Sequence, residues 1–452
     1  MRNLKLIYRT TALVFGLLLM QSCNDTVCEY PDMINNPLCP NNPALGYMIV
    51  TMGGTTQASP TAMILNTNPT LTAPIGANWL DPSLGVNQLT KVPTAQLNLA
   101  TTGQIFGIAL DNAGGIYLSA TNIYATDGYS AYLPAVGSGG TAGIYYTDFS
   151  TPGITSALVK TTTVASANTV GSALIPNTGG GFNSIGNIAY DKVSDQLFAT
   201  NLEDGRIYRI NPNTGIVLSI FDPFILDTGI AGLAPFGEQL WGIGVQTFGG
   251  ITSVFFARSS GGGVKEIWSI PLTSTGEFAA TQVGATKLFD DTAASSVLEI
   301  KNVGGTQDKV TDIAFSSTGR MLLAERGNPH QSKVFEYVKS GTSWGIGNNF
   351  YLGATAGQPG ANAAGGVDYG NRQTGQSTFK CNDLVWGSSN YMTMPNSTIF
   401  YGVEGMSASG NSATVTNNPA TDLYIDYNGS YSTADKGGIG DVEIFKNRCG
   451  CK

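Results

Sequence analysis

The sequence contains one histidine, His330, among its 452 residues. A single histidine excludes a metal centre built from several histidines and leaves one possible histidine base. This residue lies in the segment Arg326-Gly-Asn-Pro-His-Gln331, where we expect a surface loop rather than a catalytic group. The sequence also lacks a Gly-x-Ser-x-Gly elbow, a His-Glu-x-x-His motif and a Gly-x-x-x-x-Gly-Lys-Ser/Thr phosphate loop. No catalytic residue is predicted.

Charge is scarce as well. Charged residues make up only 12% of the chain, and the formal net charge is −8. Because lysine and arginine form no basic stripe, nucleic acid is not an expected partner. Low charge together with 58 glycines favours a β-rich protein with many turns, of the kind found outside the cytoplasm.

The apolar run at the N-terminus is too short to span a membrane. Positive Arg2, Lys5 and Arg9 precede the apolar residues 10–20. These are about 11 residues, whereas a spanning helix needs roughly 20. A positive region followed by a short apolar run is typical of a cleaved leader, so residues 1–22 are predicted to be a signal peptide.

The leader ends in Met20-Gln21-Ser22-Cys23, which resembles the signal of bacterial lipoproteins. The resemblance implies that Cys23 becomes the lipidated first residue, although Met20 stands where leucine is usual. An ordinary secretory leader is the alternative. Residues 23–45 contain four prolines and little apolar periodicity, and so predict an extended tether. We therefore expect an exported protein attached by lipid to the outer membrane, facing the periplasm or the cell surface.

Residues 187–215 read as three strands separated by tight turns. Apolar residues alternate with smaller neighbours, and Asp, Asn and Gly cluster between the strands. Looser copies of this strand–turn–strand order are found at 106–122, 232–245, 312–327 and 383–404, interrupted by Gly-, Ser- and Asn-rich segments that we interpret as insertions, at 127–142, 246–263 and 354–380. Self-similarity in four-stranded units is typical of a β-propeller.

The two ends of the chain are left to form one further unit. Residues 440–445 have the pattern of a first strand, and 46–51, 62–66 and 95–100 could supply the other three. Such a unit would close the ring and remove the last exposed edges. We therefore predict an all-β fold, with residues 46–452 forming one β-propeller of four-stranded antiparallel blades. Six blades are favoured and seven come next. A pair of β-sandwich domains is the alternative.

The copies resemble six-bladed propellers of the NHL and SMP-30/gluconolactonase families. The segment Leu323-Ala-Glu-Arg-Gly-Asn-Pro-His-Gln-Ser-Lys-Val-Phe335 is similar to an NHL repeat, and the resemblance covers roughly residues 105–445. SMP-30-like lactonases hold a divalent metal with Glu, Asn and Asp at the mouth of the channel. The resemblance thus implies a possible Ca²⁺ site of hard oxygen ligands.

Polar residues at strand ends are the candidates for such a site, because the loops that join the strands gather at the two faces of a propeller. The candidate channel-mouth ligands are Asn122, Asn201, Asp312, Glu325, Asp383 and Glu404. The alternative is that these side chains cap turns and bind backbone amides. Apart from Ca²⁺ in a lactonase-like enzyme, no cofactor is expected.

The remaining cysteines predict disulfides, which an exported protein can form. If both chain ends meet, Cys28 or Cys39 could bond to Cys449 or Cys451. A soft-metal site made of these four thiols is the alternative. Aromatic residues in the loops, such as Tyr124 and Trp344, could stack on sugars, anchor a protein, or cover their own blades.

These patterns together favour a binding or scaffold module with a protein or glycan partner on one propeller face. The alternative is a metal-dependent, lactonase-like hydrolase with an acidic and Asn-containing site in the channel.

Overall fold

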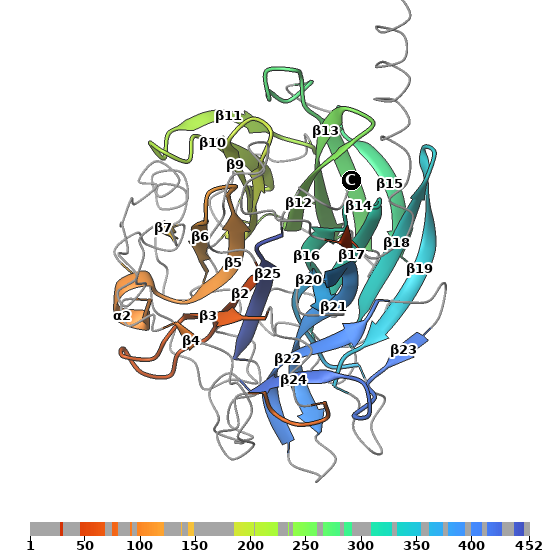
Figure 1. Ribbon diagram of the computed structural model, residues 1–452. Coiled ribbons are helices and arrows are strands. Elements are labelled where there is room, and N and C mark those ends of the chain that lie inside the picture. Colours follow the sequence, from red (N-terminus) through yellow and green to blue (C-terminus); the bar gives the residue numbers. More distant parts are fainter. Residues whose placement is uncertain are drawn as a thin grey trace, which may run out of the picture.

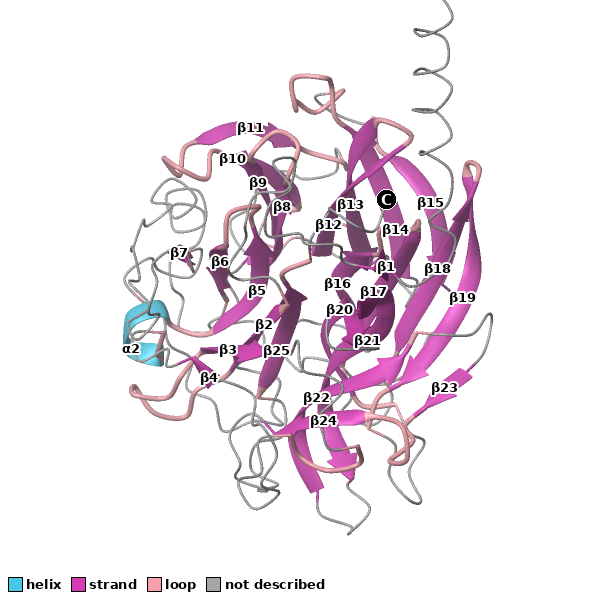
Figure 2. Ribbon diagram, viewed as in Figure 1, coloured by secondary structure: helices cyan, strands magenta, loops and turns pink. Residues whose placement is uncertain are grey.

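Strands account for nearly all the regular structure of this chain (Figure 2). The computed structural model describes residues 28–29, 46–67, 75–79, 91–92, 97–121, 137, 143–148, 185–202, 204–224, 234, 238–259, 265–280, 284–291, 309–327, 332–353, 361–373, 378–393, 399–408, 414–426 and 438–446. Within these ranges the only helix is α2 (Leu99–Thr102), and none is long and apolar enough to cross a membrane. The leader, His330 and the predicted tether apart from residues 28–29 lie outside the described residues.

The stretch 187–215 forms the antiparallel meander that its pattern predicts. Its sheet has the order β11-β10-β9-β8, with β8 (Ile185–Asp191), β9 (Gln196–Asn201), β10 (Arg206–Ile210) and β11 (Val217–Phe221). The turns contain Asp195, Gly205 and Gly215, which have φ values of 53°, 70° and 72°. Glycine and aspartate tolerate this left-handed conformation better than most residues, so the chain can turn sharply at these positions and pair each strand with the next.

Similar antiparallel sheets follow one another along the chain. One precedes the meander and consists of β5 (Ile105–Leu110), β6 (Gly115–Ala120) and β7 (Ile144–Asp148). Those that follow it are β12 (Leu240–Phe248), β13 (Ile251–Ser259), β14 (Lys265–Pro271) and β15 (Thr286–Asp291), and then β16 (Lys309–Phe315), β17 (Arg320–Arg326), β18 (Val334–Ser340) and β19 (Ser343–Tyr351). The sheet of β16–β19 continues into β20 (Ala363–Gln373), β21 (Thr378–Thr393), β22 (Ile399–Ser407) and β24 (Leu423–Asp426), because β17 also pairs with β20. Two short strands extend this part, since β1 (Cys28–Glu29) pairs with β21 and β23 (Thr414–Thr416) with β19.

The two ends of the chain share one sheet, as predicted. Its order is β25-β2-β3-β4, with β25 (Ile439–Ile444), β2 (Tyr47–Met52), β3 (Ala62–Asn66) and β4 (Lys91–Val92). Antiparallel pairing of β25 with β2 is continued by a 2.9 Å bond from the Gly46 amide to the Phe445 carbonyl. A C-terminal first strand and N-terminal outer strands therefore close the ring.

The predicted fourth strand of this sheet, at 95–100, is wrong. The fourth strand is β4, and α2 begins at Leu99 instead. Asn98 caps this helix, because its Oδ1 accepts a 3.1 Å hydrogen bond from the Thr101 amide while the Thr101 hydroxyl accepts one from the Asn98 amide. Such a reciprocal cap favours a helical turn over an extended strand.

The first strands of the sheets form a closed ring. Each of β25, β5, β8, β12, β16 and β20 packs against the next in this order, and β20 packs against β25 (Figure 1). The cores lie between neighbouring sheets; for example, Ala109 and Tyr117 pack against Ile188 and Tyr190. This arrangement is a β-propeller and excludes a pair of β-sandwiches. The described residues contribute six first strands to this ring, and the predicted number of blades stays a prediction.

In two of the copies predicted from the sequence, the residues form a different strand of the sheet from the one predicted. The apolar run at the end of 232–245 lies in β12, which is the first strand of its sheet, and β13 lies in the presumed insertion 246–263. Likewise 383–386 lies in β21, the second strand, because β20 occupies part of the presumed insertion 354–380.

The reason for the misreading is that glycine serves here for close packing rather than for loops. A Cβ atom on Gly366 of β20 would lie 2.5 Å from the Cα atom of Asp441 in β25. No side chain fits at that distance, so neighbouring first strands approach one another only where one of them has glycine.

Candidate ligand-binding site in the channel

Glycine and polar residues alternate around the ring at one level of the first strands. In ring order this level consists of Gly107, Asn187, Gly242, Asp312, Gly366 and Asp441. A Cβ atom on Gly107 would lie 2.3 Å from Oδ1 of Asn187, so the glycines make room for the polar side chains. Asn187, Asp312 and Asp441 are called the polar plug below.

The polar plug ties neighbouring first strands together. Asp441 accepts a 2.9 Å hydrogen bond from the Ile108 amide of β5, and Asp312 accepts one of 2.9 Å from the Val367 amide of β20. Asn187 donates to the Thr311 carbonyl at 2.9 Å. The inner edge of a first strand has no ladder partner, so these side chains satisfy backbone groups that would otherwise be buried without one.

Two carboxyl groups of the plug are coupled. Burial raises the pKa of Asp441 to about 7. Burial and the negative charges of Asp441 and Glu443 raise the pKa of Asp312 well above its usual value. Asp312 and Asp441 also hydrogen-bond to each other. Since two close carboxylates repel one another, the pair is expected to hold one proton at neutral pH.

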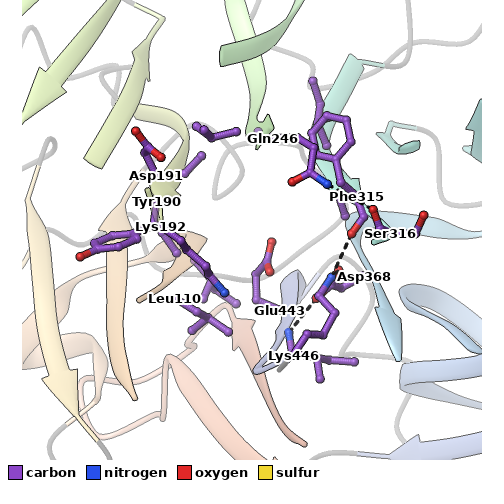
Figure 3. Close-up of a pocket in the computed structure, with 18 of the residues that line it drawn as sticks. Leu110, Tyr190, Asp191, Lys192, Gln246, Phe315, Ser316, Asp368, Glu443 and Lys446 are labelled. Atoms are coloured by element: carbon purple, nitrogen blue, oxygen red, sulfur yellow. Dashed lines mark hydrogen bonds and ion pairs between the residues drawn. The ribbon is translucent and has the colours of Figure 1, made fainter. Parts of the chain in front are cut away.

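Beside the plug the channel contains a cavity of about 440 Å³ (Figure 3). Three positions beyond the plug level, the first strands contribute Leu110, Tyr190, Val245 and Phe315 to its wall. Two positions beyond it, on the same side of the strands as the plug, four of the first strands have very small residues, namely Ala109, Ala189, Gly244 and Ala314. The volume exists because these side chains are no larger than a methyl group.

The other two first strands have acidic residues at this small-residue level, Asp368 in β20 and Glu443 in β25. The oxygens of Asp368 accept hydrogen bonds from the amides of Ile444 (2.9 Å) and Tyr369 (2.8 Å), and the carboxylate pairs with the ammonium group of Lys446. Glu443 is different. Its carboxyl group lies in the cavity (Figure 3) and makes no hydrogen bond or ion pair with any described residue.

The pKa of Glu443 is raised well above its usual value. Burial is the main cause, and the negative charges of Asp368 and Asp441 add to it. Lys446 and Lys192 act in the opposite direction. The surroundings therefore favour the neutral acid, and a positive group placed beside Glu443 would favour the carboxylate.

Hydrogen bonds hold the rim of the cavity. The Asn382 amide, at a φ of 52°, donates to Oδ1 of Asn371 at 3.1 Å, and its side chain donates to the Ser317 hydroxyl at 2.8 Å. Gln246 donates to the Ser316 carbonyl at 3.2 Å. These contacts join the turn between β16 and β17 to β21 and to β12, and β21 to β20, so the rim has a defined shape.

Several aromatic residues of the described part of the chain pack within their own sheet or against a neighbouring one. Tyr145, Tyr369 and Phe350 are fully buried. Trp344 packs edge-on against Phe248 with ring centroids 5.7 Å apart. For these four residues the structure favours the packing interpretation, whereas Tyr124 lies outside the described residues.

Of the six predicted channel-mouth residues, Asp312 lies in the channel as part of the polar plug. Asn122 lies outside the described residues. Glu325 is buried elsewhere, paired with the Lys265 ammonium group and accepting a 2.9 Å bond from the Lys333 amide. Asp383 pairs with Arg372 at 2.9 Å.

The remaining two predicted residues are also in separate places. Glu404 accepts hydrogen bonds from the amide of Gly353 and the side chain of Asn417, both at 2.7 Å. Burial and the charge of Asp422 raise its pKa well above the usual value. Asn201 ends β9 and hydrogen-bonds to Tyr208. The described members of the predicted set therefore do not converge, and no three His, Cys, Asp or Glu side chains in the described ranges are placed to hold a metal.

The cysteine predictions fall mostly outside the described residues. This applies to Cys23, Cys39, Cys449 and Cys451, so the proposed bond between the chain ends stays a prediction. Cys381 of β21, which was not assigned a bond from the sequence, is disulfide-bonded.

Comparisons with known proteins give only distant similarities. No family model and no curated protein sequence matches the chain. A structure of a nidogen/laminin complex has a TM-score of 0.38 at 12% identity and covers 89% of this chain and 100% of its own. The Cps50 (Swd1) β-propeller domain of Myceliophteria thermophila has 0.36 at 9%, covering 77% and 90%. A functionally unknown protein from Desulfotomaculum acetoxidans has 0.39 at 10%, covering 88% and 89%. The fold assignment rests on the strand order described above.

Proposed function

We propose that this protein is an exported binding module that holds its ligand in the channel cavity. The observation that carries the proposal is the cavity itself. Its volume of about 440 Å³ falls in the range of small-molecule sites, which are roughly 300–1,000 Å³ and combine apolar walls with a few polar groups. The group that enters the cavity belongs either to a free small molecule or to a protein or glycan partner docked on this propeller face.

Export and the lipid anchor are part of the same proposal. Their support is the sequence alone, from the positive leader to Ser22-Cys23. Lipid on Cys23 would keep the propeller at the outer membrane, on its periplasmic or its outer side. Labelling of growing cells with a fatty-acid analogue tests the anchor. We expect the label on the unmodified protein and none on a Cys23→Ser variant, and an unmodified N-terminus at Cys23 would refute the anchor.

Blocking the rim tests the binding site. Ser317 is exposed at the rim, so Ser317→Trp would place a large side chain across the entrance while Ser317→Ala removes only a hydroxyl. A panel of amines, amino acids, sugars and short peptides is screened by thermal shift. We expect hits on the unmodified protein and on Ser317→Ala to be lost with Ser317→Trp. Hits that persist in Ser317→Trp would place the binding site elsewhere.

The lactonase-like alternative needs a divalent cation, and the polar plug has the hard oxygen ligands that Ca²⁺ prefers. The fit is poor, however, because Asp441 accepts bonds from the amides of Ile108 and Val442, and Asp312 from that of Val367. Few oxygens are left for an ion that takes six to eight ligands. A Ca²⁺-dependent rise in melting temperature that Asp312→Asn abolishes would support this alternative over the binding module.

A further inference from the structure

We propose that the channel cavity takes an organic cation, an ammonium group attached to a small apolar body, and that Glu443 binds the ammonium group. This inference rests on the proposed function, which places the ligand in the cavity, and it names the chemistry of that ligand.

The first argument is the charge balance of the cavity. Three carboxylates and two ammonium groups line it, namely Asp191, Asp368, Glu443, Lys192 and Lys446. When Glu443 is ionised, one negative charge is therefore left over. A ligand with a single positive charge would complete the balance, whereas an anion would add to the excess.

The second argument identifies Glu443 as the group that receives the ligand. Asp368 uses its oxygens for two backbone amides and for Lys446. Asp191 accepts bonds from the Val193 amide at 2.9 Å and the Gln196 side chain at 3.0 Å. Lys446 and Lys192 lower the pKa of Glu443, and Lys446 is the ion-pair partner of Asp368. A half-buried carboxylate without a hydrogen-bond partner is costly, so an ammonium group would find its strongest bond at Glu443.

The third argument is the apolar wall. The aliphatic residues that line the cavity are Ile108, Leu110, Ile188, Ile243, Val245, Ile313 and Ile444. Tyr190 and Phe315 add two aromatic rings, whose faces attract cations. A hydrated metal ion makes no use of such a wall, and Ca²⁺ needs six to eight oxygens where one unpaired carboxylate is present. A neutral sugar would bring no charge to pair with Glu443 and so would gain nothing from ionisation of this acid.

The test compares n-butylammonium with its neutral isostere n-butanol, using calorimetry or NMR titration at pH 8. We expect n-butylammonium to bind at least tenfold more tightly than n-butanol. Glu443→Gln should remove this difference. Glu277→Gln is the matched control, because it makes the same change on a side chain that is 64% exposed and outside the cavity.

The pH dependence provides a second readout on the unmodified protein. Alkylammonium groups stay charged up to a pKa of about 10, as lysine does. Affinity should therefore fall as pH decreases through the raised pKa of Glu443 and the acid takes up its proton. The charged groups around Glu443 are Lys192, Asp368, Asp441 and Lys446.

Three results would overturn the inference. One is equal affinity for the two probes, another is unchanged n-butylammonium affinity in Glu443→Gln, and the third is competition by CaCl₂ that Glu443→Gln abolishes. In each case ligands that Ser317→Trp excludes would still support the cavity as a binding site. If Ser317→Trp abolishes binding, the proposed function stands and only the cation inference has failed. If binding persists in Ser317→Trp, the proposed function itself has failed.

Discussion

The coupled carboxyl pair of the polar plug makes stability depend on pH in an unusual direction. A carboxyl group with a higher pKa in the folded than in the unfolded chain holds its proton more tightly when folded. Its contribution is fully present below the unfolded value and is lost as pH rises through the folded value. For Asp441 these values are 3.8 and about 7, so this window lies between pH 4 and 7.

The magnitude follows from the two pKa values. A difference of one in pKa corresponds to about 1.36 kcal/mol, so raising Asp441 from 3.8 to about 7 gives on the order of 4 kcal/mol over the whole window. Of this free energy, about 2–3 kcal/mol is lost between pH 5 and pH 8. The raised pKa of Asp312 acts in the same direction.

Asp441→Asn removes the titration and keeps the shape. Asparagine has one acceptor oxygen, so one of the two amides bound by Asp441 loses its partner, at a cost of about 1–2 kcal/mol at every pH. The variant should be less stable than the unmodified protein at pH 5. At pH 8 the difference should shrink or reverse, because the unmodified protein has lost about 2–3 kcal/mol that the variant never had.

Urea unfolding followed by tryptophan fluorescence at both pH values measures these differences. Thr51→Val is the control, because it removes a neutral hydroxyl that contacts the Asp441 amide at 2.8 Å and the Phe106 carbonyl at 2.6 Å. Its cost should be the same at pH 5 and pH 8. If the effect of Asp441→Asn is equally independent of pH, the raised pKa and the shared proton are both wrong.

Two further substitutions test the packing of the ring. Gly366→Ala should lower the free energy of unfolding by at least about 2 kcal/mol in urea, because its Cβ would lie 2.5 Å from Asp441, whereas Gly345→Ala, with no atom closer than 4.0 Å, should change it by less than about 1 kcal/mol. Glu325→Gln leaves the buried Lys265 without its charge partner and should cost about 3–5 kcal/mol in the same assay; a cost below 1 kcal/mol would contradict the buried ion pair.

The fold could be predicted largely because its signals are local. The meander at 187–215 contains its own turn residues, and residues 440–445 have the alternation of a first strand that lacks an adjacent second strand. Where the signal was wrong, as at β12 and β20, glycine was interpreted as a loop residue. Glycine is required in these two strands because the neighbouring first strand lies too close to leave room for a Cβ atom. That neighbouring strand is distant in the sequence, so the sequence pattern does not reveal the contact.

The site could not be predicted in the same way, because its contacts are long-range. Asp441 binds the amide of Ile108, which is 333 residues away, and Asp312 of β16 binds that of Val367 in β20, which is 55 residues away. The sequence pattern predicted functional residues at strand ends, whereas Asn187 and Glu443 lie within first strands. An alignment of the first strands on Ile108, whose equivalents are aliphatic in all six, would have shown the alternation of glycine and polar residues.

The same alternation links the fold to the proposed function. At the plug level, glycine on every second strand lets Asn187, Asp312 and Asp441 reach across and close the channel. Two positions further on, four strands have only alanine or glycine, and no long side chain reaches across from a neighbouring strand, so the space stays open. Glu443 occupies that space on the C-terminal first strand, which the pairing of β25 with β2 holds in the ring. Closure of the ring by both chain ends therefore also positions the carboxyl group to which we assign ligand binding.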